Sequence, residues 1–595
     1  MSMISVGFRP PGRSVVATVV LCVLMATWRI VAQDSAGQSE EEAHAESVYA
    51  RGMAALQKGD LSAAHADFER LVALAPRSPE VHNSLGWVLL HQGHTDAAIV
   101  EFRLAVKLRA DFAQAHLNLA NALTERRDFD EAESEARESV RLAPKDSEAH
   151  RTLSRVMSFR AKGPAAITEM HAALALDPER PDLHDDLGSL LVQSSRDDEA
   201  AAEFAQALRL QPDLAAAAMH LGTLRWRQRD LAAAHSLLAK AVLSAPTSAQ
   251  AHYYFGRVLE EEKRNDDAMA ETSKAVALEP NFAEALEHLG LLQQRNGDGD
   301  KAVTAFRRLV ELRPEDAEAH NNLGLALIQA GKAPEAIKEF ESAIRMHPQD
   351  AGFVQNLGTA YLQMADFDAA ITHFQDAIRI AAQDATAHYD LGLALKLKDR
   401  LPDAIVEFHK AEELAPEQPD IHYTLGVTLW QSGDFATAED ELRAAVRAKL
   451  DYSEAYYTLG TVLQQEGKLE DAAAALRNAL SINPDLVGAH TNLASILRRQ
   501  GKTTEADAES HLAQQLLRQS NNLQAAALDT NSGKRLLQSG DLDGAISQFR
   551  SAISVAPEYL PAHQHLAEAL ERKGEKAEAE KELRKVTELT HANRD

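Results

Sequence analysis

The sequence predicts an all-α solenoid, in which helical hairpins stack one after another along the chain. Two observations predict this fold class. The sequence repeats itself with a period of 34 residues from Glu46 onward, and the phase stays constant over fourteen copies. Aromatic residues make up only 5% of the 595 residues, alanine is abundant, and no segment shows a clear strand pattern. One extended helical array therefore fits better than several separate domains.

Small and rigid residues mark the phase of the repeat. Alanine stands at all fourteen equivalent places from Ala64 to Ala506, and proline stands at ten of the fourteen places from Pro76 to Pro484. Glycine stands twelve residues before the alanine at Gly52, Gly86, Gly188, Gly222, Gly256, Gly290, Gly324, Gly358, Gly392, Gly426 and Gly460. A fixed set of backbone positions thus recurs in every copy.

The repeat from Ala317 to Asp350 shows why each copy predicts a helical hairpin. Leu323 and Leu327 lie four residues apart among alanines, which is the spacing of one face of a first helix. After a Gly-Lys turn, the apolar stripe of a second helix follows at Ala336, Ile337, Phe340, Ala343 and Ile344. We expect Gly324 and Ala336 to be small because the two helices cross closely there.

These residues resemble the signature of the tetratricopeptide repeat, and the resemblance covers nearly all of the chain after its N-terminal segment. It implies a right-handed α-solenoid superhelix of about 16 hairpins, whose concave face binds extended segments of other proteins. Where the family often has tryptophan at the fourth position, this sequence has His82, His116, His150, His184, His252, His320, His388, His422 and His490. In that respect the repeats resemble those of O-linked N-acetylglucosamine transferase, without room for its catalytic domain.

The periodicity also divides the chain into segments. They are a signal peptide or N-terminal membrane anchor at 1–32, a polar linker at 33–44, fourteen in-phase repeats at 45–520, a phase slip or hinge at 521–525, and two further repeats with a charged terminal helix at 526–593. The slip is inferred because Ala494 and Gly533 lie 39 residues apart instead of 34. The charged last helix suits a terminal repeat, which has to cap an exposed apolar edge.

The N-terminal segment predicts export. Arg9 and Arg13 precede an uncharged, mostly apolar run over residues 15–28, which has the pattern of a signal peptide. Cleavage after Ala32 would make the protein periplasmic or secreted, whereas an uncleaved segment would tether it to a membrane. The run is shorter than the roughly 20 residues that a spanning helix needs, which favours cleavage.

Composition and motifs exclude several function classes. The 27 net negative charges argue against nucleic acid as a partner and favour a basic or neutral one. The single cysteine, Cys22, leaves the repeats without a thiolate metal site. Equivalent histidines on neighbouring helices would lie roughly 8 to 10 Å apart, too far to share a metal, so we expect them to pack between helices.

Gly501, Lys502 and Thr503 lack the rest of a phosphate-binding loop. We therefore expect no enzyme, no catalytic residue, no cofactor and no metal.

The candidate binding residues follow from the family resemblance, which implies that first-helix positions two, five, six, nine, twelve and thirteen line the concave face. The candidates are Asn321, Asn322, Gln355, Asn356, Tyr389, Asp390, Tyr423, Thr424, Trp430, Tyr457, Thr458, Thr491 and Asn492. Their amides pair with a peptide backbone, and tyrosine offers flat apolar area with a polar tip. The alternative is that they pack against the adjacent first helix or face water.

Three functions compete at this stage. The leading one is a non-enzymatic scaffold that binds peptide segments of other proteins and is exported or tethered to a membrane through its N-terminal segment. A second is an accessory subunit that positions the substrate of a separately encoded transferase. An RNA-binding helical-repeat protein fits least, because it would show a basic groove and a different period.

Overall fold

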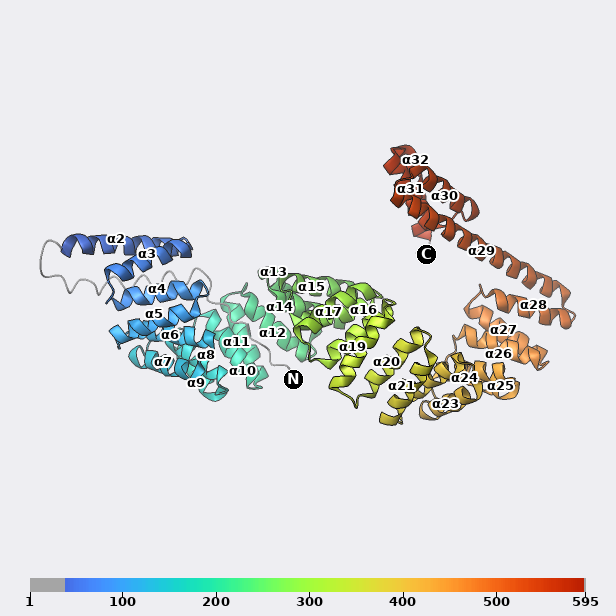
Figure 1. Ribbon diagram of the computed structural model, residues 1–595, viewed down its shortest axis with the longest axis horizontal. Helices are drawn as coiled ribbons and strands as arrows, with labels where there is room; N and C mark the ends of the chain where they lie inside the picture. The colour runs from blue at the N-terminus through green and yellow to red at the C-terminus, as the bar shows by residue number, and fades with distance from the viewer. Residues whose placement is uncertain (1–37, 593–595) are drawn as a thin grey trace. The chain divides into compact units, whose positions relative to one another are not determined.

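The computed structural model describes residues 38–592, with side chains from His44 to Thr590, and within this range it contains only helices (Figure 1). The chain divides into two compact halves, one up to Leu292 and the other from Gln293 onward. The prediction of an all-α solenoid of helical hairpins is confirmed.

The N-terminal half contains seven complete hairpins. Its helices are α2 (Gln38–Gln57), α3 (Leu61–Leu74), α4 (Pro79–His91), α5 (Thr95–Leu108), α6 (Ala113–Arg126), α7 (Phe129–Leu142), α8 (Ser147–Phe159), α9 (Gly163–Leu176), α10 (Pro181–Gln193), α11 (Asp197–Leu210), α12 (Ala215–Arg227), α13 (Leu231–Ser244), α14 (Ala249–Glu261) and α15 (Asn265–Leu278). The next helix, α16 (Ala283–Arg295), contains the boundary between the halves.

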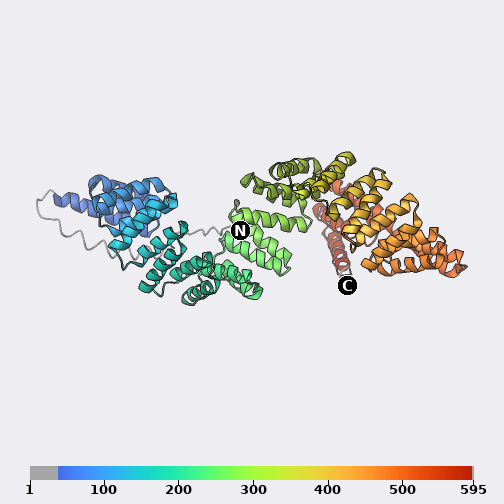
Figure 2. The ribbon, with the colours of Figure 1, turned by 90° about the horizontal axis from the view of Figure 1, so that it is seen from below.

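The C-terminal half continues the same pattern. Its helices are α17 (Gly299–Leu312), α18 (Ala317–Gln329), α19 (Ala333–Met346), α20 (Ala351–Gln363), α21 (Phe367–Ile380), α22 (Ala385–Leu397), α23 (Leu401–Leu414), α24 (Pro419–Ser432), α25 (Phe435–Ala448), α26 (Ser453–Gln465), α27 (Leu469–Ile482), α28 (Val487–Arg499), α29 (Thr503–Ser539), α30 (Leu542–Val555), α31 (Leu560–Lys573) and α32 (Lys576–Ala592). Figure 2, turned by 90°, shows the same paired helices from a second side.

The hairpin of α18 and α19 shows how sequence sets the helix crossing. Asp316 caps α18 by accepting a hydrogen bond from the backbone N–H of Ala319 at 3.3 Å. Gly331 has φ +72° in the turn, a conformation that favours glycine. Gly324 faces the buried ring of Phe340, and a Cβ on this glycine would overlap the ring. The prediction that Gly324 is small because of a close crossing is confirmed, and the tight contact is with the aromatic side chain.

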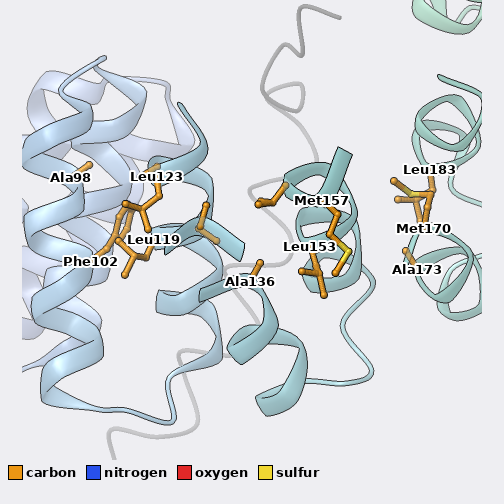
Figure 3. Close-up of a cluster of buried hydrophobic side chains, with 14 of the residues drawn as sticks. Ala98, Phe102, Leu119, Leu123, Ala136, Leu153, Met157, Met170, Ala173 and Leu183 are labelled. Carbon is orange, nitrogen blue, oxygen red and sulfur yellow. The ribbon is translucent and has the colours of Figure 1, made fainter. Parts of the chain in front are cut away.

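The core is a chain of interhelical contacts that passes from hairpin to hairpin. Figure 3 shows one part of it in the N-terminal half, where Phe102, Leu123, Leu153, Met170 and other apolar side chains from α5 to α10 line up in sequence. Each of these four side chains is at most 2% exposed. Such a core has no single centre, so each hairpin is stabilised by its immediate neighbours.

Helix α29 departs from the hairpin pattern. Its 37 residues form the second helix of the fourteenth repeat and then the first helix of the fifteenth, so residues 521–525 lie inside one continuous helix. The expected hinge therefore does not interrupt the helix. The phase slip lengthens it instead, because residues 512–528 contain neither glycine nor proline and are rich in glutamine, leucine and alanine. Residues 514–524 of this helix are exposed, apart from Leu516, which is half-buried.

The fourteenth repeat carries polar residues where other repeats carry apolar ones. In the ninth repeat, Ile337, Phe340 and Ile344 form the stripe of the second helix, whereas the equivalent residues of α29 are Asp507, Ser510 and Gln514. Accordingly, the apolar cluster of the preceding repeats ends at Ala506, and separate clusters begin at Ala526 and Leu537. The stack of fourteen repeats thus ends in a polar face.

At the N-terminal end, α2 begins at Gln38. Residues 38–44 of the expected polar linker over 33–44 are therefore helical, and their three consecutive glutamates favour helix. The expected signal peptide or anchor, with Cys22, lies outside the described residues. Within the described range, none of the helices combines the length and the apolar character needed to span a bilayer.

Candidate binding face

First helices of neighbouring repeats contact one another within each half. Contacts between them join α4 to α6, α6 to α8, α10 to α12 and α12 to α14 in one half, and α18 to α20, α20 to α22, α24 to α26 and α26 to α28 in the other. These contacts are additional to those within each hairpin and between sequence neighbours. Side chains at the fifth and sixth positions of the first helices therefore lie beside their counterparts in the next repeat.

Candidate residues at these positions form a ladder of hydrogen bonds with a regular offset. The fifth residue of one repeat pairs with the sixth residue of the next, 35 residues later. The Asn356 amide donates to Asn321 Oδ1 at 2.8 Å, and the Gln355 amide donates to Asp390 Oδ2 at 2.7 Å. The same offset places the Tyr389 hydroxyl 3.0 Å from Thr424 Oγ1. In these three pairs the candidate residues therefore pack against the adjacent first helix, as the alternative to ligand binding predicted.

The remaining candidates lie along the same helices with a variety of partners. The Trp430 indole donates to Gln465 Oε1 at 2.8 Å, and the Asn492 amide donates to Thr461 Oγ1 at 3.1 Å. Thr458 is buried and donates to the carbonyl of Glu454, whereas Thr491 is exposed and donates to the carbonyl of Val487. Asn322, Tyr423 and Tyr457 are half-buried on the same helices.

Three candidate tyrosines, Tyr389, Tyr423 and Tyr457, form a half-buried aromatic ridge on α22, α24 and α26. The ring of Tyr423 lies 5.0 Å from the ring of Tyr452, whose hydroxyl donates to Asp420 Oδ1 at 2.8 Å. Burial, together with the Asp420 carboxylate, raises the pKa of Tyr452. The Tyr457 hydroxyl lies 2.7 Å from the place where Gly488 would carry a Cβ, so this glycine makes room for the ring. Each of the three rings is therefore partly packed against protein and partly exposed.

This arrangement suits a polypeptide ligand. An amide that donates one hydrogen bond to its neighbour keeps a second N–H and carbonyl lone pairs for a ligand. Burial raises the pKa of Asp390 and of Tyr389, which favours their neutral forms on this face. Half-buried tyrosines supply rigid apolar area at low entropic cost. The face therefore combines prepositioned amides with aromatic area, as an extended backbone requires.

The N-terminal half carries a charged version of the same ladder, which the sequence analysis missed. Arg151 Nε donates to Asp186 Oδ2 at 2.6 Å, and His220 Nδ1 lies 2.9 Å from Asp185 Oδ1. Burial raises the pKa of Asp186 to about 6, even though Arg151 favours its ionised form. The signal was present in the sequence, since opposite charges stand at the fifth and sixth positions of consecutive repeats.

One trio of side chains in the described part of the chain has the composition of a metal site: Glu412, His422 and Glu441. His422 Nδ1 lies 2.7 Å from Glu441 Oε2 and 3.6 Å from Glu412 Oε1. Two ligands of a tetrahedral zinc ion lie roughly 3.3 Å apart, since each is about 2 Å from the metal. The shorter distance is that of a hydrogen bond, and nine other histidines make the same bond to a glutamate.

We therefore expect zinc to leave the protein unaffected. Titration of the full chain with zinc chloride, followed by thermal unfolding, should leave the Tm unchanged, because the one trio among the described residues is held by a hydrogen bond between His422 and Glu441. A variant with Glu412→Gln and Glu441→Gln serves as the control. A large rise in Tm that the variant lacks would show that the trio binds metal.

The sequence matches two family models that share one description, tetratricopeptide repeat. The first matches residues 49–111, 160–215, 220–286, 288–351, 400–452, 423–487 and 457–515, and the second matches residues 89–156, 327–395 and 536–594. No curated protein matches the chain in sequence.

Three solved structures illustrate its similarity to known folds. The chain is 16% identical to a chain of the APC/C hetero-tetramer Cut9-Hcn1, covering 90% of this chain and 98% of that one, with a TM-score of 0.34. It is 23% identical to YrrB, titled a TPR protein with an unusual peptide-binding site, covering 30% and 92%, with a TM-score of 0.28. It is 20% identical to PilF of Pseudomonas aeruginosa, covering 35% and 94%, with a TM-score of 0.32.

The family assignment rests on the family models, which cover more than half of the chain. The resemblance of the repeats to those of the glycosyltransferase stays a prediction. On the evidence of these family models, the chain belongs to the tetratricopeptide repeat family.

Proposed function

We propose that this protein is a non-enzymatic scaffold that binds extended segments of other proteins along the first helices of its ninth to fourteenth repeats. The observation that carries the proposal is the tyrosine ridge of Tyr389, Tyr423 and Tyr457, which continues the row of amides on α18 and α20. Aromatic side chains are enriched at binding hot spots, and amides pair with a peptide backbone. The excess of 27 negative charges favours a basic or neutral partner.

The place of action is part of the same proposal. The basic residues and apolar run at the N-terminus support export to the periplasm or the outside of the cell, or attachment to a membrane. The partner would then be a protein of the cell envelope.

Replacing Tyr389, Tyr423 and Tyr457 together with alanine should weaken partner binding at least about tenfold, because hot-spot aromatics each contribute more than about 1 kcal/mol. The measurement is a pull-down with the full chain as bait from envelope and cytoplasmic extracts, followed by an affinity titration with the purified partner. Far-UV circular dichroism should show the same helix content in the variant, since the rings are only half-buried.

The matched control replaces the same tyrosines with phenylalanine, which keeps the flat area and removes the hydroxyls. We expect this control to bind more tightly than the alanine variant. Equal affinity of the alanine variant and the unmodified chain would place the binding surface elsewhere, and partners found only in the cytoplasmic extract would contradict export.

A further inference from the structure

Ten hairpins share one side-chain arrangement, which we name the His–Glu clamp. A histidine at the fourth position of the first helix places Nδ1 2.5–2.7 Å from a glutamate Oε2 on the second helix, 19 residues later. The clamps are His82–Glu101, His116–Glu135, His150–Glu169, His184–Glu203, His252–Glu271, His320–Glu339, His388–Glu407, His422–Glu441, His490–Glu509 and His563–Glu582.

The other ring nitrogen also has a fixed partner. In every clamp, Nε2 lies 2.8–3.4 Å from the backbone carbonyl oxygen of the residue six places earlier, in the turn before the first helix. Each histidine thus ties together both helices of its hairpin and the turn that enters it. The ten imidazole side chains are at most 13% exposed.

The two clamp residues occur together within the sequence. All ten repeats with histidine at the fourth position have glutamate 19 residues later. The six other repeats have neither residue, and their pairs are Val48 and Asp67, Ala218 and Leu237, Leu286 and Ala305, Val354 and His373, Tyr456 and Ala475, and Asp529 and Gln548. Glutamate therefore occurs at this position only in repeats that also have the histidine. Its presence is explained by the pairing with the histidine.

The chemistry of the partners sets the protonation state of the clamp. A carboxylate and a backbone carbonyl both only accept hydrogen bonds. A neutral imidazole has one N–H and can satisfy only one of them, whereas imidazolium has two and satisfies both. A clamp in which both hydrogen bonds form therefore contains imidazolium, which carries one proton more than a neutral imidazole. In a buried site, the unsatisfied alternative is costly.

Other charged groups near the clamps either favour or oppose the positively charged form of the histidine. Glu138 adds negative charge near His116, and Glu412, itself 3.1 Å from His409, adds it near His422. For His116, burial lowers the pKa, but Glu135, the Ala110 carbonyl and Glu138 outweigh burial and raise it overall.

At His422, the hydrogen bond with Glu441 is the largest cause of a raised pKa. Lysines compete at two other clamps, where Lys274 pairs with Glu271 at 2.8 Å and Lys410 pairs with Glu407 at 2.7 Å. In these two clamps the glutamate carboxylate is shared between the histidine and a lysine ammonium group.

We propose that the His–Glu clamps make the packing of the repeats a proton-dependent property, so that the array is rigid in mildly acidic surroundings and loosens as the pH rises past neutrality. The sign follows from the protons. A histidine in an unfolded chain has a pKa of about 6.5, and folding raises the pKa of His116 and His422, so the stabilisation from these two clamps is complete below that value. The stabilisation is lost as the pH rises through the raised pKa of the folded state.

The test compares the full chain with variants in which clamp glutamates become glutamine. A glutamine amide can donate to Nδ1 of a neutral imidazole, whose Nε2–H still bonds to the carbonyl, so Glu135→Gln and Glu441→Gln keep the clamp without its extra proton. The control is Glu413→Gln, which removes one negative charge from an exposed place on α23. Thermal unfolding is followed from about pH 5.5 to about pH 8.5, the range around the histidine pKa.

We expect the Tm of the unmodified chain to fall steadily over this range, the fall to be smaller in the double variant, and the control to follow the unmodified chain. A pH-independent Tm, or an equal fall in the double variant, would overturn the proposal. A second readout needs no variant: 15N spectra of the histidine-labelled chain near pH 7 should show both nitrogens protonated in the rings of His116 and His422. Single-tautomer neutral rings at these two positions would equally overturn it.

Discussion

Phe340→Ala is expected to destabilise the ninth repeat by about 3–5 kcal/mol, the cost of removing a large aromatic side chain from a packed core. The ring is fully buried between α18 and α19 and fills the space that Gly324 leaves open. The glycine cannot fill the resulting cavity, because it has no side chain, so little of the loss is recovered. Seven other hairpins bury a phenylalanine at the same place, which makes the effect a property of the repeat.

Hydrogen exchange is the suitable measurement, because a long repeat array does not unfold in one two-state step. Amides of α18 to α20 should lose protection in the variant, while those of α26 and α27 should keep it, since repeats contact only their neighbours. Phe340→Leu is the matched control, because leucine stands at the equivalent place in Leu238, Leu442 and Leu476. Uniform loss of protection along the chain would contradict the local character of the core.

Asn521→Pro should break α29 at a cost of about 3 kcal/mol to the helix, because proline removes one backbone hydrogen bond and clashes with the preceding turn. Residue 521 is exposed and lies between the flanking apolar clusters, which end at Ala506 and begin again at Ala526. The cores on both sides should therefore stay folded while the connection between them becomes flexible.

Spin labels on α28 and α30 would report this change as a broader distribution of label-to-label distances. Asn521→Ala is the control, because alanine favours helix and should leave the distribution narrow. Equal distributions in the two variants would mean that residues 521–525 already act as the hinge that the phase slip suggested.

Much of the fold follows from the sequence because the repeat is redundant. Fourteen copies of the same small and apolar positions average out local ambiguity, so the hairpin, its turn and the close approach at Gly324 were all predictable. The continuous helix α29 was not, because a shift in phase indicates extra residues without saying whether they form a loop or add turns of helix. The absence of glycine and proline from residues 512–528 was the available clue.

The candidate site was predictable only as a set of positions. The sequence placed Asn321, Gln355 and Tyr389 on first helices, but not the offset of 35 residues that joins each to the next repeat. That offset depends on how far one hairpin turns relative to the next, which no single repeat encodes. The His–Glu clamp was hidden for another reason: its pairing rule appears only when repeats with and without the histidine are compared, as with His320 and Val354.

The polar face of the fourteenth repeat has a consequence for the evolution of the chain. Arrays grow and shrink by duplication or loss of whole repeats, and a new copy is tolerated only where both of its neighbours offer apolar partners. Asp507, Ser510 and Gln514 remove that partner surface at one place. Copy number can therefore vary upstream of this point without disturbing the apolar clusters of the last two hairpins.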